Sequence, residues 1–510
     1  MLRNLRNSLR LFRIGYTLAR HDALFPLEEA GVSPLVTLTC KLLAQRSKER
    51  RGVRLSKALQ ALGPSFIKLG QSFSTRADLV GEDVAADLAN LRDNLPPFPT
   101  AEAKRIIETE FDKPFVDIFA SFDDTPIAAA SIAQVHFAVL HDGREVAVKI
   151  LRPTVVAEFT RDLELFFWLA DLVEATRPEL RRLKPREVVQ TFANSVKMEL
   201  DLRFEAGSAS ELKENMTADT DFYIPEIHLP LTSQRVLTLE RINGISLGQI
   251  ELLKQQNYDL LKLQKTLSES FFKQVFRDGF FHADLHPGNL IVMQDGRLAA
   301  VDFGIMGRIS EQERLYIAEM LRGFLNEDYR RIAELHFDAG YVPAHQSVEQ
   351  FTLACRAIGQ PVAGKPLHEI SAGKLLAQMF AVTETFEMET QPQLLLMQKT
   401  MVMVEGVGRM LNPEMNIWQM AEPLIQDWAK QHLGPMAQAK LRLKELKHLA
   451  ERLPATLKRA DRWLKRLEEG GLPIHPATIE HFLAERRRQH YQWLLLGWVA
   501  LGLLAISLLS

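Results

Sequence analysis

The spacing of hydrophobic positions changes several times along the chain, and each change predicts a different element. Residues 56–110 carry apolar side chains at helical spacing, and Gly63-Pro64 begins one of these helices. From Phe115 onward short β-type runs replace them. HFAVL and REVAVKI are separated by His141-Asp142-Gly143, and an Asp-Gly pair between alternating runs is a strong signal for a hairpin. The chain is therefore expected to pass from helices into a small antiparallel sheet.

The remainder of the interior alternates in the same way. Helical spacing returns over 155–215, and RVLTLERI before Asn243-Gly244 predicts another strand. A single helix is predicted from Ile250 to Val275, followed by a second hairpin in LIVMQDGRLAAVDFG with Asp295-Gly296 at its turn. From Glu311 to about Lys447 the spacing is helical throughout. This order of elements predicts an α+β fold.

The end of the sequence is an uninterrupted apolar stretch. Residues 493–509 contain no charge, and three arginines precede them at 486–488. A helix of this length spans about 25 Å, slightly less than the ~30 Å hydrocarbon core, and flanking Trp and Arg side chains can bridge the difference. We predict a C-terminal transmembrane anchor with the bulk of the chain in the cytoplasm; a buried core helix is the alternative.

Two basic segments accompany this predicted anchor. The first twenty residues hold five arginines and no acidic residue, with Leu2, Leu5, Leu9 and Phe12 at helical spacing. Such a helix can lie on anionic lipid or dock on the body of the protein, and the sequence leaves both open. The second segment, Lys440–Arg466, leads towards the anchor and is expected to contact lipid.

Composition limits the class of protein. Of 510 residues, 46% are hydrophobic and 25% charged, which is typical of a globular protein and excludes a disordered one. The balance of 62 Lys and Arg against 64 Asp and Glu argues against a nucleic-acid partner. The two cysteines, Cys40 and Cys355, cannot form a disulfide framework and suit a reducing compartment.

The segment FHADLHPGNLIV and the VDFG that follows carry the clearest chemistry. Asp284 precedes Asn289 by five positions, and Asp302 lies thirteen positions further on. Phosphoryl transfer needs this order: one carboxylate acts on the nucleophile, while an amide oxygen and a second carboxylate bind Mg²⁺ at the ATP phosphates. His282 and His286 are expected to support the loop rather than to bind a metal.

A kinase-like site also needs an upstream lysine, and Lys149 follows the first hairpin in VAVK. Its acidic partner is expected in SVKMELDLRFEAGSASEL, which is predicted as one helix. Six residues of a helix turn through about 600°, so that Glu199 and Glu205 would lie about 120° apart and face different neighbours. The segment from Thr238 to Ile242 is predicted as the interlobe hinge, whose backbone groups, at Glu240 and Ile242, would bind the adenine edge.

The glycine-rich loop of ordinary kinases is missing, and an Ala-rich segment from Pro126 to His136 stands in its place. Alanine resists the positive φ angles that glycine allows, so this loop must approach a nucleotide differently. We expect altered nucleotide selectivity or attenuated phosphoryl transfer.

Several segments together resemble the UbiB family of atypical kinase-like proteins required for ubiquinone biosynthesis. They are the Ala-rich loop, IKLGQ followed by STRADL, MELDLRFEA, FFHADLHPGN, VDFGI, FLNEDYRRIAELHFDAGYVP and ETQPQLLLMQKTMVMVEGVGRML. The resemblance implies a two-lobed kinase-like fold with added N-terminal (KxGQ) and C-terminal helices and a C-terminal transmembrane helix. The expected parts are a basic amphipathic region (1–55), the KxGQ extension (56–110), an N-lobe with a helical insertion (111–240), a C-lobe (241–345), a family-specific helical region (346–450), a basic juxtamembrane region (451–490) and the transmembrane helix (493–509).

The resemblance also implies roles for individual residues. Asp284 takes the catalytic position, Asn289 and Asp302 bind Mg²⁺, and ATP contacts Lys149 and a run along the Ala-rich loop: Ile127, Ala128, Ala129, Ala130, Ser131, Ile132, Ala133, Gln134 and Val135. Lys68 and Gln71 match the KxGQ signature, which places a helix over the entry for a protein substrate, and Glu199 and Asp201 match the ExD signature. Glu199 is expected to face Lys68, which leaves Glu205 for Lys149. Val80-Gly81 departs from the family, which usually has a proline there.

Three functions remain open at this stage. The first is an ATP-dependent enzyme of the inner membrane that supports ubiquinone synthesis. The second is a kinase for a protein or a small molecule, and the third is a non-catalytic scaffold that binds nucleotide. Expected partners are membrane lipids, ubiquinone precursors, other ubiquinone-biosynthesis proteins and, as an open question, a second copy of the chain.

Overall fold

The structure is a computed structural model, and all of the residues that it describes fall within Met1–Lys430. They are residues 2–25, 47–74, 80–89, 91, 95–176, 185–360, 382, 385–388, 391–414, 420 and 428. The predicted anchor at 493–509, the basic segment Lys440–Arg466 and most of STRADL lie outside them. Within the described ranges, no helix is both long and apolar enough to cross a membrane.

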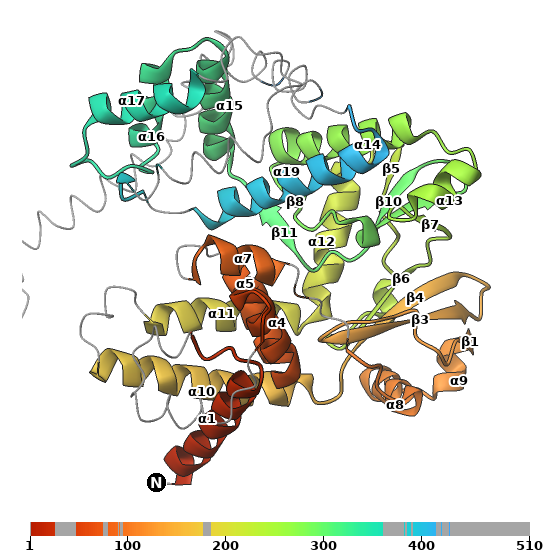
Figure 1. Cartoon of the computed structure of the whole chain (residues 1–510). Helices are drawn as coiled ribbons and strands as arrows, with labels where there is room; N and C mark the ends of the chain where they lie inside the picture. Colours follow the sequence, from red (N-terminus) through yellow and green to blue (C-terminus); the bar gives the residue numbers. More distant parts are fainter. Residues whose placement is uncertain are drawn as a thin grey trace, which may run out of the picture. The chain divides into compact units, whose positions relative to one another are not determined.

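An antiparallel sheet forms the N-lobe, in the order β1 (Phe119–Phe122), β3 (Ala133–Leu140), β4 (Glu145–Leu151) and β6 (Val236–Glu240), with β2 (Ala128–Ala129) also paired to β3 (Figure 1). The predicted first hairpin is confirmed by the β3–β4 register. Side chains of β4 alternate between the two faces. Val146, Val148 and Ile150 pack on α8 (Thr100–Phe111) and α9 (Phe115–Ile118), which leaves Lys149 on the opposite face.

Helices that precede this sheet in the sequence, and others that follow its first strands, form a second layer. It contains α1 (Leu2–Arg20), α4 (Arg51–Leu62), α5 (Pro64–Ser74), α7 (Glu82–Ala89), α10 (Val155–Thr176) and α11 (Pro185–Glu199). Their apolar faces share one core with the Lys149 face of the sheet, which contributes Ala147 and Leu237. The KxGQ extension is therefore continuous with the N-lobe core.

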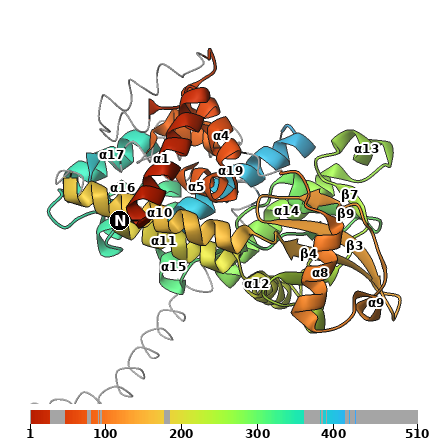
Figure 2. The ribbon, with the colours of Figure 1, turned by 90° about the horizontal axis from the view of Figure 1, so that it is seen from below.

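The basic helix α1 docks on this layer, as one of the two alternatives predicted. Helix α1 lies beside α10 (Figure 2). Leu18 and Ala19 are buried in the shared core, and Arg10 forms an ion pair with Asp162 of α10. Phe12 remains 69% exposed on the outer face of α1, so lipid contact by that face stays a prediction.

Two of the predicted long helices are broken. The single helix expected through MELDLRFEA is wrong, because α11 ends at Glu199 and α12 (Leu202–Asn215) begins after Asp201, whose side chain accepts a hydrogen bond from the Arg203 amide as an N-cap. The helix expected from Ile250 to Val275 is also wrong. It divides into α13 (Ile250–Gln255) and α14 (Leu260–Phe272) at Asn257, whose φ of +58° no α-helix accommodates.

The C-lobe contains two small sheets around α14. One has the order β5 (Phe222–Tyr223), β10 (Leu298–Ala300), β9 (Leu290–Met293) and β7 (Gly244–Ser246), and the antiparallel β9–β10 pair confirms the second hairpin. The other pairs β8 (Phe280–His282) with β11 (Met306–Arg308). The segment between α14 and β8, Lys273–Asp278, is a π-helix. The loop that carries Asp284 and Asn289 follows β8 directly.

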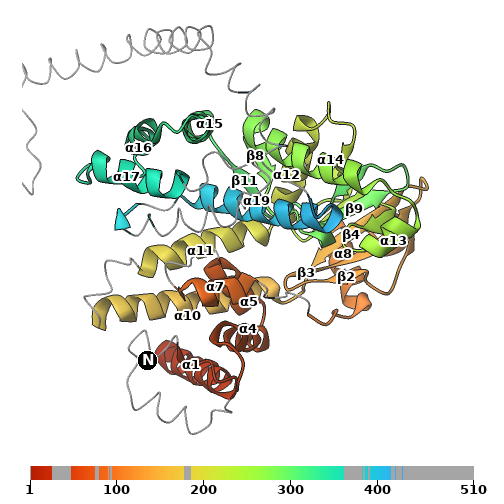
Figure 3. The same cartoon turned by 45° about the horizontal axis from the view of Figure 1, so that its top comes forward.

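Helices continue after the C-lobe, as predicted, within the described part of 311–447. They are α15 (Glu311–Leu325), α16 (Tyr329–Asp338), α17 (Val348–Gly359) and α19 (Pro392–Leu411) (Figure 3). Helix α19 packs along α14. Its fully buried Thr400 donates a hydrogen bond to the carbonyl of Ala283, at 3.1 Å. The last described helix thus touches the loop that holds the predicted catalytic aspartate.

Candidate functional site

Lys149 joins two carboxylates that come from different elements. In the middle of β4 it lies between Val135 of β3 and Leu237 of β6. Its Nζ donates to Glu205 Oε1 and Oε2, at 2.8 and 2.9 Å, and to Asp302 Oδ1, at 2.9 Å. The pairing of Lys149 with Glu205, and not with Glu199, is therefore present. The side chains of Lys149 and Glu205 are 13% and 8% exposed, whereas that of Asp302 is 51% exposed.

The three charges shift one another's proton affinities. Burial by itself lowers the pKa of Lys149, but the carboxylates of Asp302 and Glu205 outweigh it and raise that pKa. The pKa of Asp302 falls, because the Lys149 ammonium outweighs the opposing effect of burial. For Glu205 burial is the stronger effect, so its pKa rises in spite of Lys149. With both carboxylates ionised, the three groups carry one net negative charge.

The turn at Asp302 is held in an unusual backbone conformation. Its φ is +68°, which costs free energy for a residue with a Cβ and is found mainly where neighbouring contacts enforce it. Here the amide of Phe303 donates to Glu205 Oε1 at 3.3 Å, and the amide of Gly304 donates to Asp302 Oδ1 at 3.3 Å. Lys149 and Gly304 both bind Oδ1, so Oδ2 of the half-exposed carboxylate is left for another ligand.

The loop after β8 brings Asp284 and Asn289 together. Asn289 Nδ2 donates to the carbonyl and to Oδ2 of Asp284, at 3.0 and 3.2 Å, which turns Asn289 Oδ1 away from it. The buried ring of His282 accepts from the Asp284 amide at 3.1 Å, and His286 accepts from the Gly288 amide at 3.0 Å. Both histidines thus support the loop, as predicted. No cluster of metal-binding His, Cys, Asp and Glu occurs within the described ranges.

The Ala-rich loop folds back as a tight turn on β3. Ala128 and Ala129 pair with Val135 and Gln134, and the Ala130 amide donates to the Ala133 carbonyl at 2.8 Å. The buried hydroxyl of Ser131 has no hydrogen-bond partner in the described part of the chain. The turn needs no residue at positive φ, so alanine is compatible with this conformation.

Arg152 holds this turn and was not predicted from the sequence. Its Nε and Nη2 donate to the Ala130 carbonyl at 3.0 and 2.9 Å, and its amide donates to the Ile132 carbonyl at 2.8 Å. Nη2 also donates to the carbonyls of Leu95 and Pro96, at 3.3 and 3.0 Å. Burial lowers the pKa of this guanidinium without removing its charge. The sequence alone does not show whether an arginine that follows a strand binds backbone carbonyls or is exposed to solvent.

The predicted hinge is fixed between the two lobes. Two backbone amides of the hinge are already paired: that of Glu240 donates to the Glu226 carbonyl, and that of Arg241 donates to the Glu145 carbonyl. The next amide along the chain is that of the buried Ile242. The side chain of Glu240 accepts from the Tyr223 hydroxyl at 2.7 Å. Burial, followed by this bond to Glu240, raises the pKa of Tyr223 to about 12. Because Tyr223 lies on β5 and Glu240 on β6, their hydrogen bond connects the sheets of the two lobes.

The lysine of the KxGQ signature meets the glutamate of the ExD signature beside the start of α12. Lys68 of α5 forms an ion pair with Glu199 at 2.6 Å, and these side chains are 13% and 21% exposed. Asp201 instead turns to Arg203, at 2.6 Å. Gln71 lies about one turn after Lys68 on α5 and is half-buried. Glu199 and Glu205 therefore form ion pairs with different lysines, Lys68 and Lys149.

The donor set suits Mg-ATP. Mg²⁺ prefers oxygen ligands, commonly one or two carboxylates together with substrate phosphates. Asp302 Oδ2 and Asn289 Oδ1 are such ligands, and Lys149 offers an ammonium group to phosphate oxygens. Asp284 bears a carboxylate, 26% exposed, beside Asn289. These are the donor types that a metal–nucleotide complex and an attacking hydroxyl or water would need.

Two family models and a solved structure match parts of this chain. The family model of the ABC1 atypical kinase-like domain matches residues 90–336, and that of the UbiB helical domain matches residues 355–416. A solved complex of Mycobacterium tuberculosis Rv3197 with erythromycin is 22% identical and covers 78% of this chain and 96% of that one, with a TM-score of 0.48.

Two curated relatives are both named probable protein kinase UbiB. That of Marinobacter nauticus is 39% identical over 480 residues, or 92% of this chain and 85% of the relative. That of Xylella fastidiosa strain M12 is 41% identical over 430 residues, or 83% and 78% of the two chains. The chain belongs to the UbiB family and contains its ABC1 atypical kinase-like domain.

Proposed function

We propose that this protein is a membrane-anchored, ATP-dependent atypical kinase-like enzyme that supports ubiquinone biosynthesis. It binds Mg-ATP and acts on, or organises, lipid-soluble intermediates and the enzymes that process them. One observation carries the nucleotide part of this proposal. Lys149 is held by Glu205 and by Asp302 at the same time, and Asp302 belongs to the same lobe as the Asp284–Asn289 loop.

Each part of ATP has a group to receive it. The Glu240 carbonyl and the Ile242 amide face the adenine edge, the Ala-rich turn covers the phosphates, and Lys149 binds α- and β-phosphate oxygens. Asn289 and Asp302 hold Mg²⁺, which neutralises charge on the phosphates when it is bound. Asp284 orients the attacking group and takes up its proton.

Hydrolysis of ATP is favoured over phosphorylation of a protein. The Lys68–Glu199 ion pair fastens α5 to the last residue of α11, three residues before α12 begins at Leu202. The KxGQ helix is thereby secured next to the helix that carries Glu205. A helix fixed at this position restricts the approach of a large acceptor, whereas water or a small molecule still has access.

Membrane association is proposed from both ends of the sequence. Residues 493–509 are long enough and apolar enough in sequence to anchor the chain, with the catalytic domain on the cytoplasmic side of the inner membrane. On the exposed face of α1, Phe12 and Tyr16 are 69% and 43% exposed, and Arg13 and Arg20 accompany them. Aromatic and basic side chains on one face suit the surface of an anionic bilayer. Removal of residues 493–510 should release most of the protein from membranes, and full retention would contradict this role.

The test of the nucleotide proposal is release of phosphate from ATP by the full chain with Mg²⁺ and lipid. Asp302→Asn should abolish phosphate release, because Asp302 is both a proposed Mg²⁺ ligand and a partner of Lys149, and the substitution weakens both interactions. Asp295→Asn is the matched control: Asp295 lies on the β9–β10 turn, and its one side-chain partner among the described residues is the neighbouring Arg297, at 2.7 Å. Equal phosphate release by wild type and Asp302→Asn would remove the hydrolytic mechanism.

Two other activities give different outcomes. Transfer of labelled γ-phosphate to a metabolite or protein, lost in Asp284→Asn, would make the chain a true kinase. Restoration of ubiquinone in a deletion strain by single copies of both Asp284→Asn and Asp302→Asn would instead identify a nucleotide-binding scaffold. Failure of both variants contradicts the scaffold and supports a catalytic role.

A further inference from the structure

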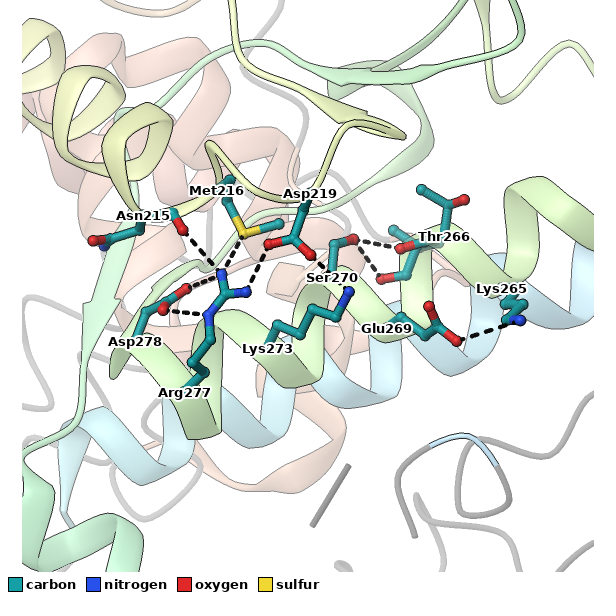
Figure 4. Close-up of polar contacts among 11 residues, drawn as sticks. Asn215, Met216, Asp219, Lys265, Thr266, Glu269, Ser270, Lys273, Arg277 and Asp278 are labelled. Carbon is teal, nitrogen blue, oxygen red and sulfur yellow. Dashed lines mark hydrogen bonds and ion pairs between the residues drawn. The ribbon is translucent and has the colours of Figure 1, made fainter. Parts of the chain in front are cut away.

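A cluster of charged residues joins the end of α12 to the end of α14 (Figure 4). Asp219, in the loop after α12, accepts hydrogen bonds from Lys273 Nζ at 2.6 Å and from Arg277 Nη1 at 2.7 Å. Its side chain is 11% exposed. Arg277 also binds both oxygens of Asp278, at 2.7 and 2.8 Å, and donates to the carbonyl of Asn215, the last residue of α12, at 3.0 Å. The predicted nucleotide site uses none of these groups.

Lys273 and Arg277 belong to the π-helical segment Lys273–Asp278, which we call the π turn. Single π turns within helices occur frequently at functional sites. Between the two cations, the fully buried Gln274 accepts a hydrogen bond from the His282 amide at 2.9 Å. His282 in turn accepts from the amide of Asp284. The same turn therefore contacts the end of α12 on one side and supports the catalytic loop on the other.

Helix α12 is suited to transmit a displacement from this end to the site. It has 14 residues, and Leu202, Ala206, Ala209 and Leu212 are buried along its length. Glu205 precedes Asn215 by ten residues, or about 15 Å of helix. At the other end, the Leu202 amide donates to the Gln234 carbonyl at 3.0 Å. A helix packed in this way moves as one piece, so a shift at Asn215 also moves Glu205.

We propose that Asp219 is a positioning residue for the nucleotide site. By binding Lys273 and Arg277, it fixes α12 to the π turn and keeps Glu205 in register with the loop that carries Asp284. Glu205 then holds both Lys149 and the turn at Asp302. This inference rests on the proposed binding of Mg-nucleotide, and it adds a distant control of that site.

The charge of Asp219 is essential to this connection. Burial by itself raises its pKa, but hydrogen bonds and charge from Lys273 and Arg277 outweigh burial and lower the pKa, so the carboxylate is ionised at neutral pH. Asp219→Asn keeps the shape of the side chain but leaves two cations without their shared anion. We expect the ends of the two helices to separate.

The experiment is a double-mutant cycle with the full chain in detergent. The dissociation constant of a Mg²⁺-bound, non-hydrolysable ATP analogue is measured for wild type, Asp219→Asn, Glu205→Gln and the double variant. Asp219→Asn should weaken binding about three- to tenfold, a size typical of coupling within one network. The double variant should bind no more weakly than Glu205→Gln alone, because Asp219 acts through Glu205. Glu269→Gln is the control and should bind as wild type does, since within the described part of the chain the Glu269 side chain pairs only with Lys265 of α14, at 3.7 Å.

The outcomes separate this inference from the proposed function. Wild-type affinity in Asp219→Asn, or an equal further loss when it is added to Glu205→Gln, would overturn the positioning role. Absence of nucleotide binding by the wild-type chain would overturn the proposed function and this inference together. If Asp219→Asn does not fold, Lys273→Gln removes only one of the two bonds to Asp219, and the same cycle with Glu205→Gln decides.

Discussion

Replacing Lys149 with methionine removes the cation that two carboxylates share. Methionine retains most of the aliphatic stem, so the change is mainly one of charge. The remaining Glu205 is 8% exposed and has lost its partner, whereas Asp302 is half-exposed and remains hydrated. Removing one member of a buried ion pair typically costs about 3–5 kcal/mol, because a buried charge is left uncompensated. We therefore expect the free energy of unfolding to fall by about that amount.

A second substitution tests whether this cost arises at Glu205. Adding Glu205→Gln removes the uncompensated charge, so the double variant should recover most of the lost stability. The pH dependence follows from the same reasoning. Burial raises the pKa of Glu205 above its ordinary value of about 4.5 even with Lys149 present, and loss of Lys149 raises it further. The folded single variant then binds a proton that the unfolded chain releases, so its stability decreases as pH rises through the raised pKa.

Urea unfolding of the full chain in detergent, followed by far-UV circular dichroism at pH 5 and pH 8, measures both effects. Lys149→Met should be closer to wild type at pH 5 than at pH 8, and the double variant should lose this difference. A double variant as unstable as Lys149→Met would refute the reasoning, as would a single variant with the same deficit at both pH values. Either result would mean that Glu205 is not the buried charge that Lys149 stabilises.

Three further changes test other contacts. Arg152→Met removes the donors that hold the Ala-rich turn and should weaken Mg-nucleotide binding about ten- to hundredfold, as one charged hydrogen bond typically contributes about 1.5–3 kcal/mol; unchanged affinity in calorimetric titration would contradict this. Thr400→Val keeps the shape of the buried side chain but removes its bond to the catalytic loop, so stability to urea should fall by about 1–2 kcal/mol and phosphate release should slow. Gly307→Ala would place a Cβ 2.1 Å from the buried ring of Phe281 and should lower the thermal unfolding midpoint, whereas Gly406→Ala, with open space around it, should not; equal midpoints would refute the packing argument.

Local signals in the sequence predicted the parts of the fold that depend on neighbouring residues. Both hairpins were predicted, because an Asp-Gly pair specifies a turn by itself and the alternating runs specify the strands around it. The helix break at Asn257 was not, because apolar spacing continues across it and asparagine is only a weak sign of positive φ. Hydrophobic spacing therefore identified the type of element more reliably than its ends.

The candidate site divides in a similar way. The order and spacing of Lys149, Asp284, Asn289 and Asp302 predicted a kinase-like site. The structure shows contacts of Lys149 with Asp302 and of Asn289 with Asp284, and the catalytic roles stay predictions. Residue spacing alone offered several acidic partners for Lys149, and the family resemblance favoured Glu205, which the structure places there. Arg152 carries no comparable signal. Its partners are backbone carbonyls up to 57 residues away, and backbone acceptors leave no trace in the identity of side chains.

The break between α11 and α12 explains why the ExD signature needs its two acids at this spacing. Glu199 is the last residue of α11, the buried Leu200 follows, and Asp201 is the N-cap of α12. The glutamate faces Lys68 at the point where the first helix ends, and the aspartate caps the start of the next helix. An unbroken helix would hold Glu199 and Glu205 rigidly about 120° apart. Because the two helices are separate, α11 is fastened to the KxGQ helix through Lys68, whereas α12 contacts the nucleotide site and the π turn. Each lysine–glutamate pair can therefore form or break without the other.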